Sequence, residues 1–236
     1  MSKRGVALIT GLEFEAHIAR KLVKNTDNSC FVLTAGLGAP DAVRIVAEAK
    51  NSGALGIVSF GVCGGLDPAL PPGSIVLPEI ILAGGEIFVD LNWHKSIKKL
   101  LEHDFEIATG KILAVDKTVE TVEEKAQLHR QSGACAIDME SGILAREAAR
   151  KNLPFIAVRV IHDPATQAIP AAFADIMKPN GQIDPWKLVK GLMLNWPGFA
   201  ELRKMSDNDA QARANLEGLT RLALPAFGRV DCHLNS

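Results

Sequence analysis

Short apolar runs alternate with amphipathic segments along about two thirds of the chain. Several runs lack polar alternation, as is typical of strands that are covered on both faces. The predicted strands are 5–10 (GVALIT), 30–36 (CFVLTAG), 55–61 (LGIVSFG), 74–82 (SIVLPEIIL), 111–116 (KILAVD), 134–138 (ACAID) and 154–161 (PFIAVRVI). Helices are predicted between them, at 14–24, 39–51, 94–103, 120–131 and 139–151. This alternation predicts an α/β fold, a three-layer α/β/α sandwich with a central mixed, mainly parallel sheet.

The pattern changes after Asp163. Prolines and glycines interrupt the remaining sequence, which holds no strand-like run. Such interruptions predict short helical pieces. We therefore expect an α/β core over residues 1–163 and a C-terminal helical extension of the same domain over residues 164–236.

Composition and charge narrow the class of protein. With 236 residues, of which 47% are hydrophobic, the chain can bury the core of one large domain. The net charge is −1 and the basic residues are dispersed, which argues against a nucleic-acid partner. The four cysteines lack metal-ligand spacing, so we expect reduced core residues of a cytoplasmic protein and no metal site. No apolar stretch reaches the roughly 18–20 residues that cross a bilayer.

Acids and glycines follow the predicted strands, at the sheet edge where α/β proteins bind ligands. Glu15 lies at the start of the first helix, and Gly38 follows the second strand. Each has a plain structural interpretation, since acids complement a helix N-terminus and glycines permit turns. The same holds for Asp138 and Glu140, which precede another helix. Glu15, the glycine turns, Glu140 and Asp163 together predict a pocket of acids and backbone amides without a metal-ligand set, while Asp138 keeps the role of a helix cap.

The motifs in this order resemble those of the nucleoside phosphorylase and nucleosidase superfamily. They are GLEFEA, GLG, SFGVCGGLDPALPPGSIV, AIDMESGILA and PFIAVRVIHDPA, and they span about residues 5–165. The GL-x-FEA start, the HDPATQAIP junction and the long tail with tryptophan and proline are most similar to the hopanoid-associated phosphorylases. The resemblance implies cleavage of a purine N-ribosidic bond.

The resemblance also implies roles for individual residues. Glu140 would accept hydrogen bonds from the ribose hydroxyls, and Met139 would pack against the ribose face. Asp163 would deliver a proton to purine N7, and we expect burial to raise its pKa for that purpose. His162 beside it could tune or relay this proton.

Glu15 matches the glutamate that orients the attacking water in the hydrolytic members, with Glu13 as the alternative if the alignment shifts by two. The backbone around Val119 matches the purine-recognition strand. Thr118 stands where many relatives carry an aromatic residue that stacks on the base.

The nucleophile stays open between phosphate and water. Its predicted site comprises Gly11, Gly38, Ser59 and Val62. Hexameric phosphorylases bind phosphate with an arginine and a serine in this region, whereas a valine offers no charge-assisted donor. Arg20 and Arg44 are further candidates for binding phosphate, the latter across a subunit interface.

The resemblance to the hopanoid-associated group implies phosphorolysis, with inorganic phosphate as the co-substrate and no other cofactor. The implied substrate is adenosylhopane, which would give adenine and phosphoribosylhopane in hopanoid biosynthesis. One alternative is a hydrolytic nucleosidase for 5′-modified adenosines such as methylthioadenosine or S-adenosylhomocysteine. A second alternative is a non-catalytic nucleoside-binding module. Superfamily members commonly complete their sites as homodimers or higher homo-oligomers, so we expect one here.

The tail interleaves aromatic and basic residues over 184–204. This composition suits peripheral contact with a membrane or a channel for a lipid-linked nucleoside. Packing against the core or a partner subunit is the alternative interpretation.

Overall fold

The structure, a computed structural model, describes residues 5–24, 30–36, 38–39, 41–169 and 199–227. Its described strands form one sheet and comprise β1 (Gly5–Thr10), β2 (Cys30–Thr34), β3 (Ala54–Gly65), β4 (Ile75–Val76), β5 (Ile80–Leu82), β6 (Glu86–Phe88), β7 (Ile107–Ala108), β8 (Lys111–Ala114), β9 (Ala136–Asp138) and β10 (Phe155–Asp163). The described helices are α1 (Glu13–Val23), α2 (Ala42–Asn51), α3 (Leu91–Leu101), α4 (Val122–Ser132), α5 (Ser141–Arg150) and α8 (Phe199–Phe227).

The long strand β3 organises the sheet. Its first half pairs in parallel with β1, and most of its length pairs in parallel with β10. Its last residues, Gly64 and Gly65, instead pair antiparallel with β9. Strand β9 pairs in parallel with β8, and β8 pairs in parallel with β5, so β3 joins two halves of the sheet. The ends of β1, β9 and β10 are thereby brought to the same region of β3.

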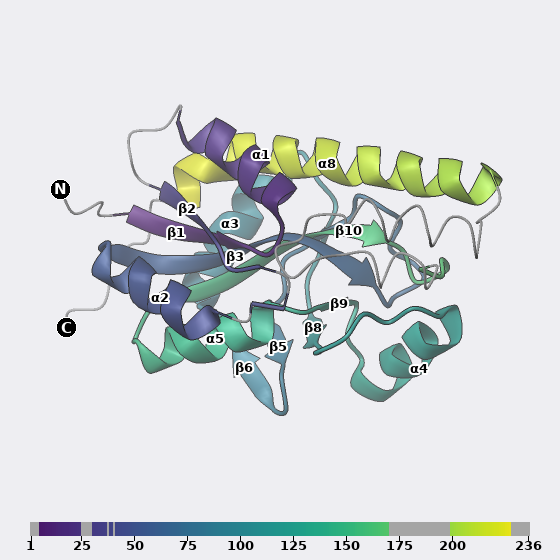
Figure 1. Cartoon of the computed structure of the whole chain (residues 1–236), viewed down its shortest axis with the longest axis horizontal. Coiled ribbons are helices and arrows are strands. Elements are labelled where there is room, and N and C mark those ends of the chain that lie inside the picture. The colour runs from purple at the N-terminus through teal and green to yellow at the C-terminus, as the bar shows by residue number, and fades with distance from the viewer. Residues whose placement is uncertain (1–4, 25–29, 37, 40, 170–198, 228–236) are drawn as a thin grey trace, which may run out of the picture.

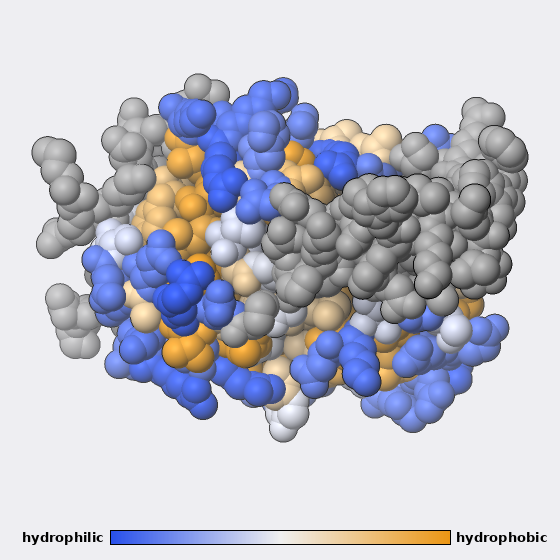
Figure 2. All heavy atoms as spheres, in the orientation of Figure 1, coloured by the Kyte–Doolittle hydropathy of each residue, from blue (hydrophilic) through white to orange (hydrophobic). Residues whose placement is uncertain are grey.

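Helices cover both faces of this sheet (Figure 1). Helix α8 packs against α1, α3 and β10 on one face, while α2 and α5 pack together on the other. The strands between these layers are apolar and buried, and all six residues of β1 are buried. Hydrophilic side chains cover the outer surfaces of α1, α2 and α4 (Figure 2). The predicted three-layer sandwich with a mixed, mainly parallel sheet is therefore confirmed.

Three features of the sheet differ from the sequence prediction. The single strand expected over residues 74–82 is two short strands, β4 and β5, with Pro78 between them. Proline has no N–H to donate to a sheet, so it separates the run. Strand β3 extends past Gly61 through Gly65, so glycines expected at a strand end lie within the sheet. Strands β6 and β7 were not predicted, because runs of three and two residues give no periodic signal.

The C-terminal region also differs from its prediction. The expectation of short helical pieces is wrong for residues 199–227, which form the single 29-residue helix α8. The sequence has no proline between Pro197 and Pro225, so nothing interrupts this helix along most of its length. Its buried side facing the core is formed by Ala212, Leu216, Leu219, Ala223 and Phe227. Most of the segment with interleaved aromatic and basic residues lies outside the described residues. Among the described residues, no helix is long and apolar enough to cross a membrane.

Close packing at the start of α5 generates a first prediction. A Cβ atom at Gly142 would lie 2.5 Å from Ala114 Cβ and 2.9 Å from Ala83 Cβ. We expect Gly142→Ala to lower the free energy of unfolding by roughly 1–3 kcal/mol, the usual cost of overpacking. Urea denaturation measures this change. Gly85→Ala is the matched control, since a Cβ there meets no atom within 4 Å, and it should stay within about 0.5 kcal/mol of the wild type. Equal stability of the two variants would contradict the prediction.

Candidate active site

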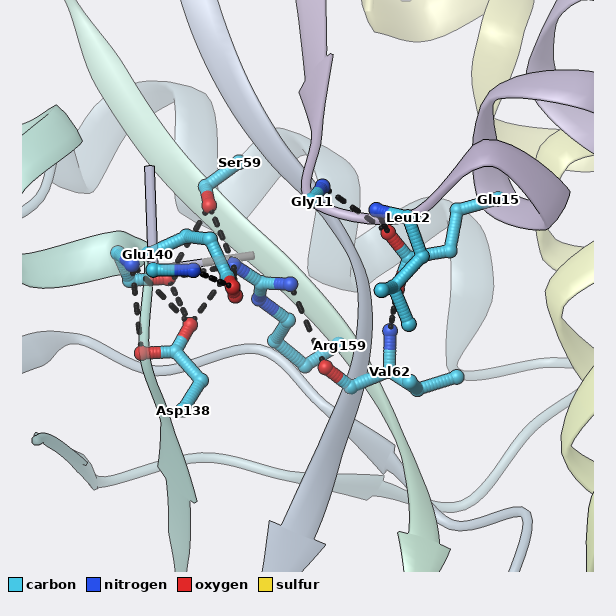
Figure 3. A network of polar contacts seen from close by, with 10 residues as sticks. Gly11, Leu12, Glu15, Ser59, Val62, Asp138, Glu140 and Arg159 are labelled. Carbon is cyan, nitrogen blue, oxygen red and sulfur yellow. Dashed lines mark hydrogen bonds and ion pairs between the residues drawn. The ribbon is translucent and has the colours of Figure 1, made fainter. Parts of the chain in front are cut away.

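A buried arginine lies at the centre of the candidate site. Arg159 is in the middle of β10 and only 1% exposed. Its Nη2 atom lies 2.8 Å from Asp138 Oδ2 and 3.5 Å from Glu140 Oε2 (Figure 3). A charge buried at this depth is tolerated only when it is paired and hydrogen-bonded. The acids on either side of Met139 therefore share one cation.

Two serines complete the surroundings of Arg159. Its Nη2 donates to Ser59 Oγ at 2.7 Å and to Ser141 Oγ at 3.2 Å. The Asp138 carboxylate accepts the backbone N–H of Ser141 at 3.3 Å and also the Ser141 hydroxyl. Asp138 thus binds the N-terminus of α5, as its position before a helix suggested. It also pairs with Arg159, a partner that its position in the sequence did not indicate.

Glu15 is held by three backbone N–H groups. Its Oε2 accepts from Gly11 at 3.0 Å and Leu12 at 2.8 Å, and its Oε1 accepts from Val62 at 2.8 Å. A Cβ atom at Gly61 would lie 2.2 Å from Oε1, so only glycine leaves room for this carboxylate. Glu13 is half-exposed and pairs with Arg20 on the surface at 3.2 Å. The structure therefore brings Glu15, and not Glu13, into the site.

Glu140 meets two glycine turns that are distant in sequence. Its Oε1 accepts the backbone N–H of Gly38 at 2.9 Å. Gly38 has a φ of +69° and its missing Cβ would lie 3.7 Å from Met139 Cε. A Cβ on Gly11 would lie 2.9 Å from Glu140 Oε1. Gly11 therefore stands between Glu15 and Glu140, and the predicted ribose residues lie beside both turns.

The charges in this cluster do not balance. Burial raises the pKa of Glu140 to about 7, because the effect of Arg159 is opposed by the charges of Asp138 and Glu15. Burial also raises the pKa of Glu15, although Arg159 and the three backbone N–H groups lower it. Asp138 and Glu140 pair with the one guanidinium, whose charge also acts on Glu15, so a single cation faces three acids.

Asp163 lies at the end of β10 with a different cation. Its Oδ2 is 2.7 Å from Nζ of Lys125, a residue of α4 that is fully buried. Lys125 also donates to the carbonyl oxygens of Pro164 at 3.1 Å and Gln167 at 3.0 Å. A Cβ on Gly64 would lie 3.0 Å from the same Oδ2. The sequence predicts that Asp163 is buried, but it does not predict this ion pair with Lys125.

The predicted base-binding residues lie in a loop between β8 and α4, and not in a strand. Thr118 is exposed, whereas Val119 packs in a small apolar cluster with Ile137. A Cβ atom on Gly64 would lie 3.0 Å from Ile137 Cγ2 as well as 3.0 Å from Asp163 Oδ2, so Ile137 and Asp163 both lie against Gly64. The loop is thus near the candidate proton donor. The purine-recognition strand expected at these residues is absent because β8 ends at Ala114.

The protein groups that were predicted to bind phosphate already have other partners within the protein. Ser59 is fully buried and accepts a hydrogen bond from Arg159, and the Val62 N–H binds Glu15. Arg20 pairs with Glu13 and donates to Thr34. Arg44 is exposed on α2 and pairs with Asp41 and Glu48. Neither arginine points its charge at the Glu15 and Glu140 cluster.

Two cations of the site were missed from the sequence. Arg159 lies in the motif PFIAVRVIHDPA, but no function was predicted for it. A charged residue inside an otherwise apolar strand nevertheless indicates a buried ion pair. Lys125 gave no such signal, because lysine on an amphipathic helix normally faces solvent.

Comparisons with known proteins agree with this architecture. The profile described as phosphorylase superfamily matches residues 11–180, whereas a comparison with curated proteins gave no match. A similar solved structure is the 5′-methylthioadenosine/S-adenosylhomocysteine nucleosidase of Neisseria meningitidis in complex with methylthio-immucillin-A. It has a TM-score of 0.66 and 16% identity, over 92% of this chain and 98% of that one.

The corresponding nucleosidase of Helicobacter pylori has a TM-score of 0.64 and 14% identity, over 88% and 99% of the two chains. Futalosine hydrolase of the same organism has a TM-score of 0.64 and 14% identity, over 87% of this chain and 98% of that one. These likenesses show the fold, and the profile covers most of the chain. The chain therefore belongs to the phosphorylase superfamily, a family of enzymes that act on nucleosides.

Proposed function

We propose that the protein is a nucleosidase, which hydrolyses the N-ribosidic bond of a purine nucleoside with a modified 5′ carbon. The observation that carries this proposal is the Glu15 carboxylate bound by the N–H groups of Gly11, Leu12 and Val62. Backbone N–H groups of this kind are natural ligands for an incoming anion. Here the protein's own carboxylate takes them.

This arrangement favours water over phosphate as the nucleophile. A phosphate dianion would approach a cluster of three acids with one guanidinium, and like charges repel strongly in a buried site. Arg159 already pairs with Asp138 and Glu140, and it donates to Ser59. Water carries no charge and can donate a proton to Glu15, whose raised pKa suits a general base.

The other residues are given roles that fit their positions. Glu140 would bind the ribose hydroxyls, with Met139 against the sugar face. This interaction strengthens as positive charge develops on the ribose. Asp163 would direct a proton to N7 of the leaving purine, with the loop around Thr118 and Val119 beside the base.

The 5′ modification is proposed from the relatives. The N. meningitidis relative was crystallised with methylthio-immucillin-A, and two of the relatives are named for 5′-methylthioadenosine. Methylthioadenosine and S-adenosylhomocysteine are therefore the first substrates to test. Phosphorolysis of adenosylhopane is the second candidate, supported by the resemblance of the sequence motifs to the hopanoid-associated group.

Phosphate dependence separates the two candidates. We expect the purified enzyme to release adenine from methylthioadenosine in phosphate-free buffer and to form free methylthioribose. Liquid chromatography with mass detection measures both products. A requirement for phosphate, with a sugar 1-phosphate as product, would overturn hydrolysis. Adenosylhopane then becomes the substrate to assay.

Glu15 and Glu13 provide a matched pair of variants. We expect Glu15→Gln to lower kcat by roughly 10²–10⁴-fold, the usual contribution of a general base. Glu13→Gln alters only a surface ion pair and should leave kcat within about twofold, because such pairs contribute little. Steady-state kinetics with methylthioadenosine measures both. Similar losses in the two variants would remove Glu15 from its proposed role.

The raised pKa of Glu140 predicts how stability depends on pH. Between the ordinary glutamate pKa of about 4.3 and pH 7 the folded protein holds a proton that the unfolded chain has lost. The free energy of unfolding should therefore fall as pH rises through this range, by about 3 kcal/mol for this group. In Glu140→Gln this contribution to the slope should be missing. Urea denaturation at pH 4.5, 6 and 7.5 measures it, and an unchanged slope would contradict the prediction.

A further inference from the structure

The C-terminal helix contributes charged residues next to Asp163. His162 Nε2 lies 3.2 Å from Asp209 Oδ1, and Asp209 is on α8. Arg213, one turn later, donates through Nε to Asp209 Oδ2 at 2.6 Å. The Arg213 guanidinium also lies over the Phe14 ring of α1, 4.0 Å from its centroid. These contacts hold Asp209 on the side of the imidazole that faces away from Asp163.

The two oxygens of Asp163 have different neighbours. Lys125 Nζ is 2.7 Å from Oδ2, whereas His162 Nδ1 lies 3.8 Å from Oδ1. Lys125 is fixed by the carbonyl oxygens of Pro164 and Gln167, and the Gln167 side chain accepts from Asn208 of α8 at 2.6 Å. Oδ2 is therefore committed to a structural ion pair, and Oδ1 faces the histidine.

We propose that His162 supplies, through Oδ1 of Asp163, the proton that the leaving purine takes, and that Asp209 positions His162 for this step. The inference rests on the proposed function, because it concerns the departure of the same purine. Asp163 is the catalytic residue that touches the base. His162 and Asp209 act through it.

The step balances in atoms and charge. As the N-ribosidic bond breaks, its electron pair moves to the purine, and the ribose carbon left with positive charge bonds to the attacking water, whose proton goes to Glu15. The His162 ring closes the 3.8 Å gap to Asp163 Oδ1 to hydrogen-bond distance, and the proton on Nδ1 then moves to Oδ1 and on to purine N7. The purine leaves neutral, and Asp163 returns to its ionised form beside Lys125. The imidazole becomes neutral and regains a proton from solvent, to which the His162 side chain is 32% exposed.

The charges around His162 support this role. Burial lowers its pKa, but the nearby carboxylate of Asp163 and the hydrogen bond and charge of Asp209 outweigh burial and raise the pKa to about 9. The hydrogen bond from His162, followed by Arg213, lowers the pKa of Asp209 to about 2. Among the described residues, the charged groups facing this pair are Asp163, Asp209 and Arg213, with Lys125 on the far oxygen of Asp163. His162 is therefore an imidazolium at neutral pH.

Two substrates with the same 5′-methylthioribose test the proposal. One carries adenine, which needs a proton to leave. The other carries 4-nitrophenol, which leaves as a stable anion without one. We expect His162→Gln and Asp209→Asn to lower kcat for the adenine substrate by about 10²-fold, the lower end of general acid catalysis, and to leave kcat for the nitrophenyl substrate within about twofold. Asp207→Asn, the same change at an exposed position of α8, is the control and should alter neither rate.

The pH profile provides a second measurement on the same enzymes. For the adenine substrate, kcat of the wild type should fall as pH rises through about 9, because His162 loses its proton. Without Asp209 the imidazolium is less stable, so this fall should move to lower pH in Asp209→Asn. The nitrophenyl substrate should not show the shift.

The outcomes are distinct. Equal losses for both substrates in the His162 and Asp209 variants would mean that these residues support only the structure, and would overturn the inference. Full activity of both variants on the adenine substrate would overturn it as well. A wild type that cleaves neither substrate would overturn the proposed function and this inference with it.

Discussion

The burial of Arg159 in the middle of β10 is the constraint on which the site depends. A guanidinium without solvent requires anionic and polar partners, and the fold supplies Asp138, Glu140 and Ser59 from two other strands and the turn before α5. Burial raises the pKa of Glu140 to about 7, and the charges of Asp138 and Glu15 add to this effect while Arg159 opposes it. The protein is therefore less stable at neutral pH than it would be without these crowded acids. In the proposed function, the acids lie where positive charge would develop on the substrate.

Glycines make this crowding of acids possible. Gly61 leaves room for the Glu15 carboxylate, Gly64 for Asp163, and Gly11 for Glu140. Because these glycines lie in or directly after β3 and β1, the acids rest against strands rather than mobile side chains. The backbone N–H groups that would suit a free anion are thereby occupied by Glu15. This is the physical basis of the proposal that water is the nucleophile.

Helix α8 connects the C-terminal region to the same chemistry. Its apolar side packs on the sheet face also covered by α1 and α3, and its polar side brings Asp209 to His162. The helix also holds the loop after Asp163 through Asn208 and Gln167. It belongs to the surroundings of Asp163 as well as to the outer layer of the sandwich.

The sequence by itself determined most of the order of strands and helices in the core, because short apolar runs that alternate with amphipathic segments are typical of buried strands separated by helices. Its motifs also marked Glu15, Glu140 and Asp163 as residues at strand ends. Local patterns could not reveal Lys125 or Asp209, since both lie on helices where a charged residue is ordinary. Only the tertiary structure decided their roles, because burial and pairing depend on residues distant in sequence: Lys125 loses solvent where α4 meets the end of β10, and Asp209 meets His162 where α8 crosses it. For the same reason only the fold could distinguish Glu15 from Glu13. Glu15 faces three backbone N–H groups, whereas Glu13 faces solvent.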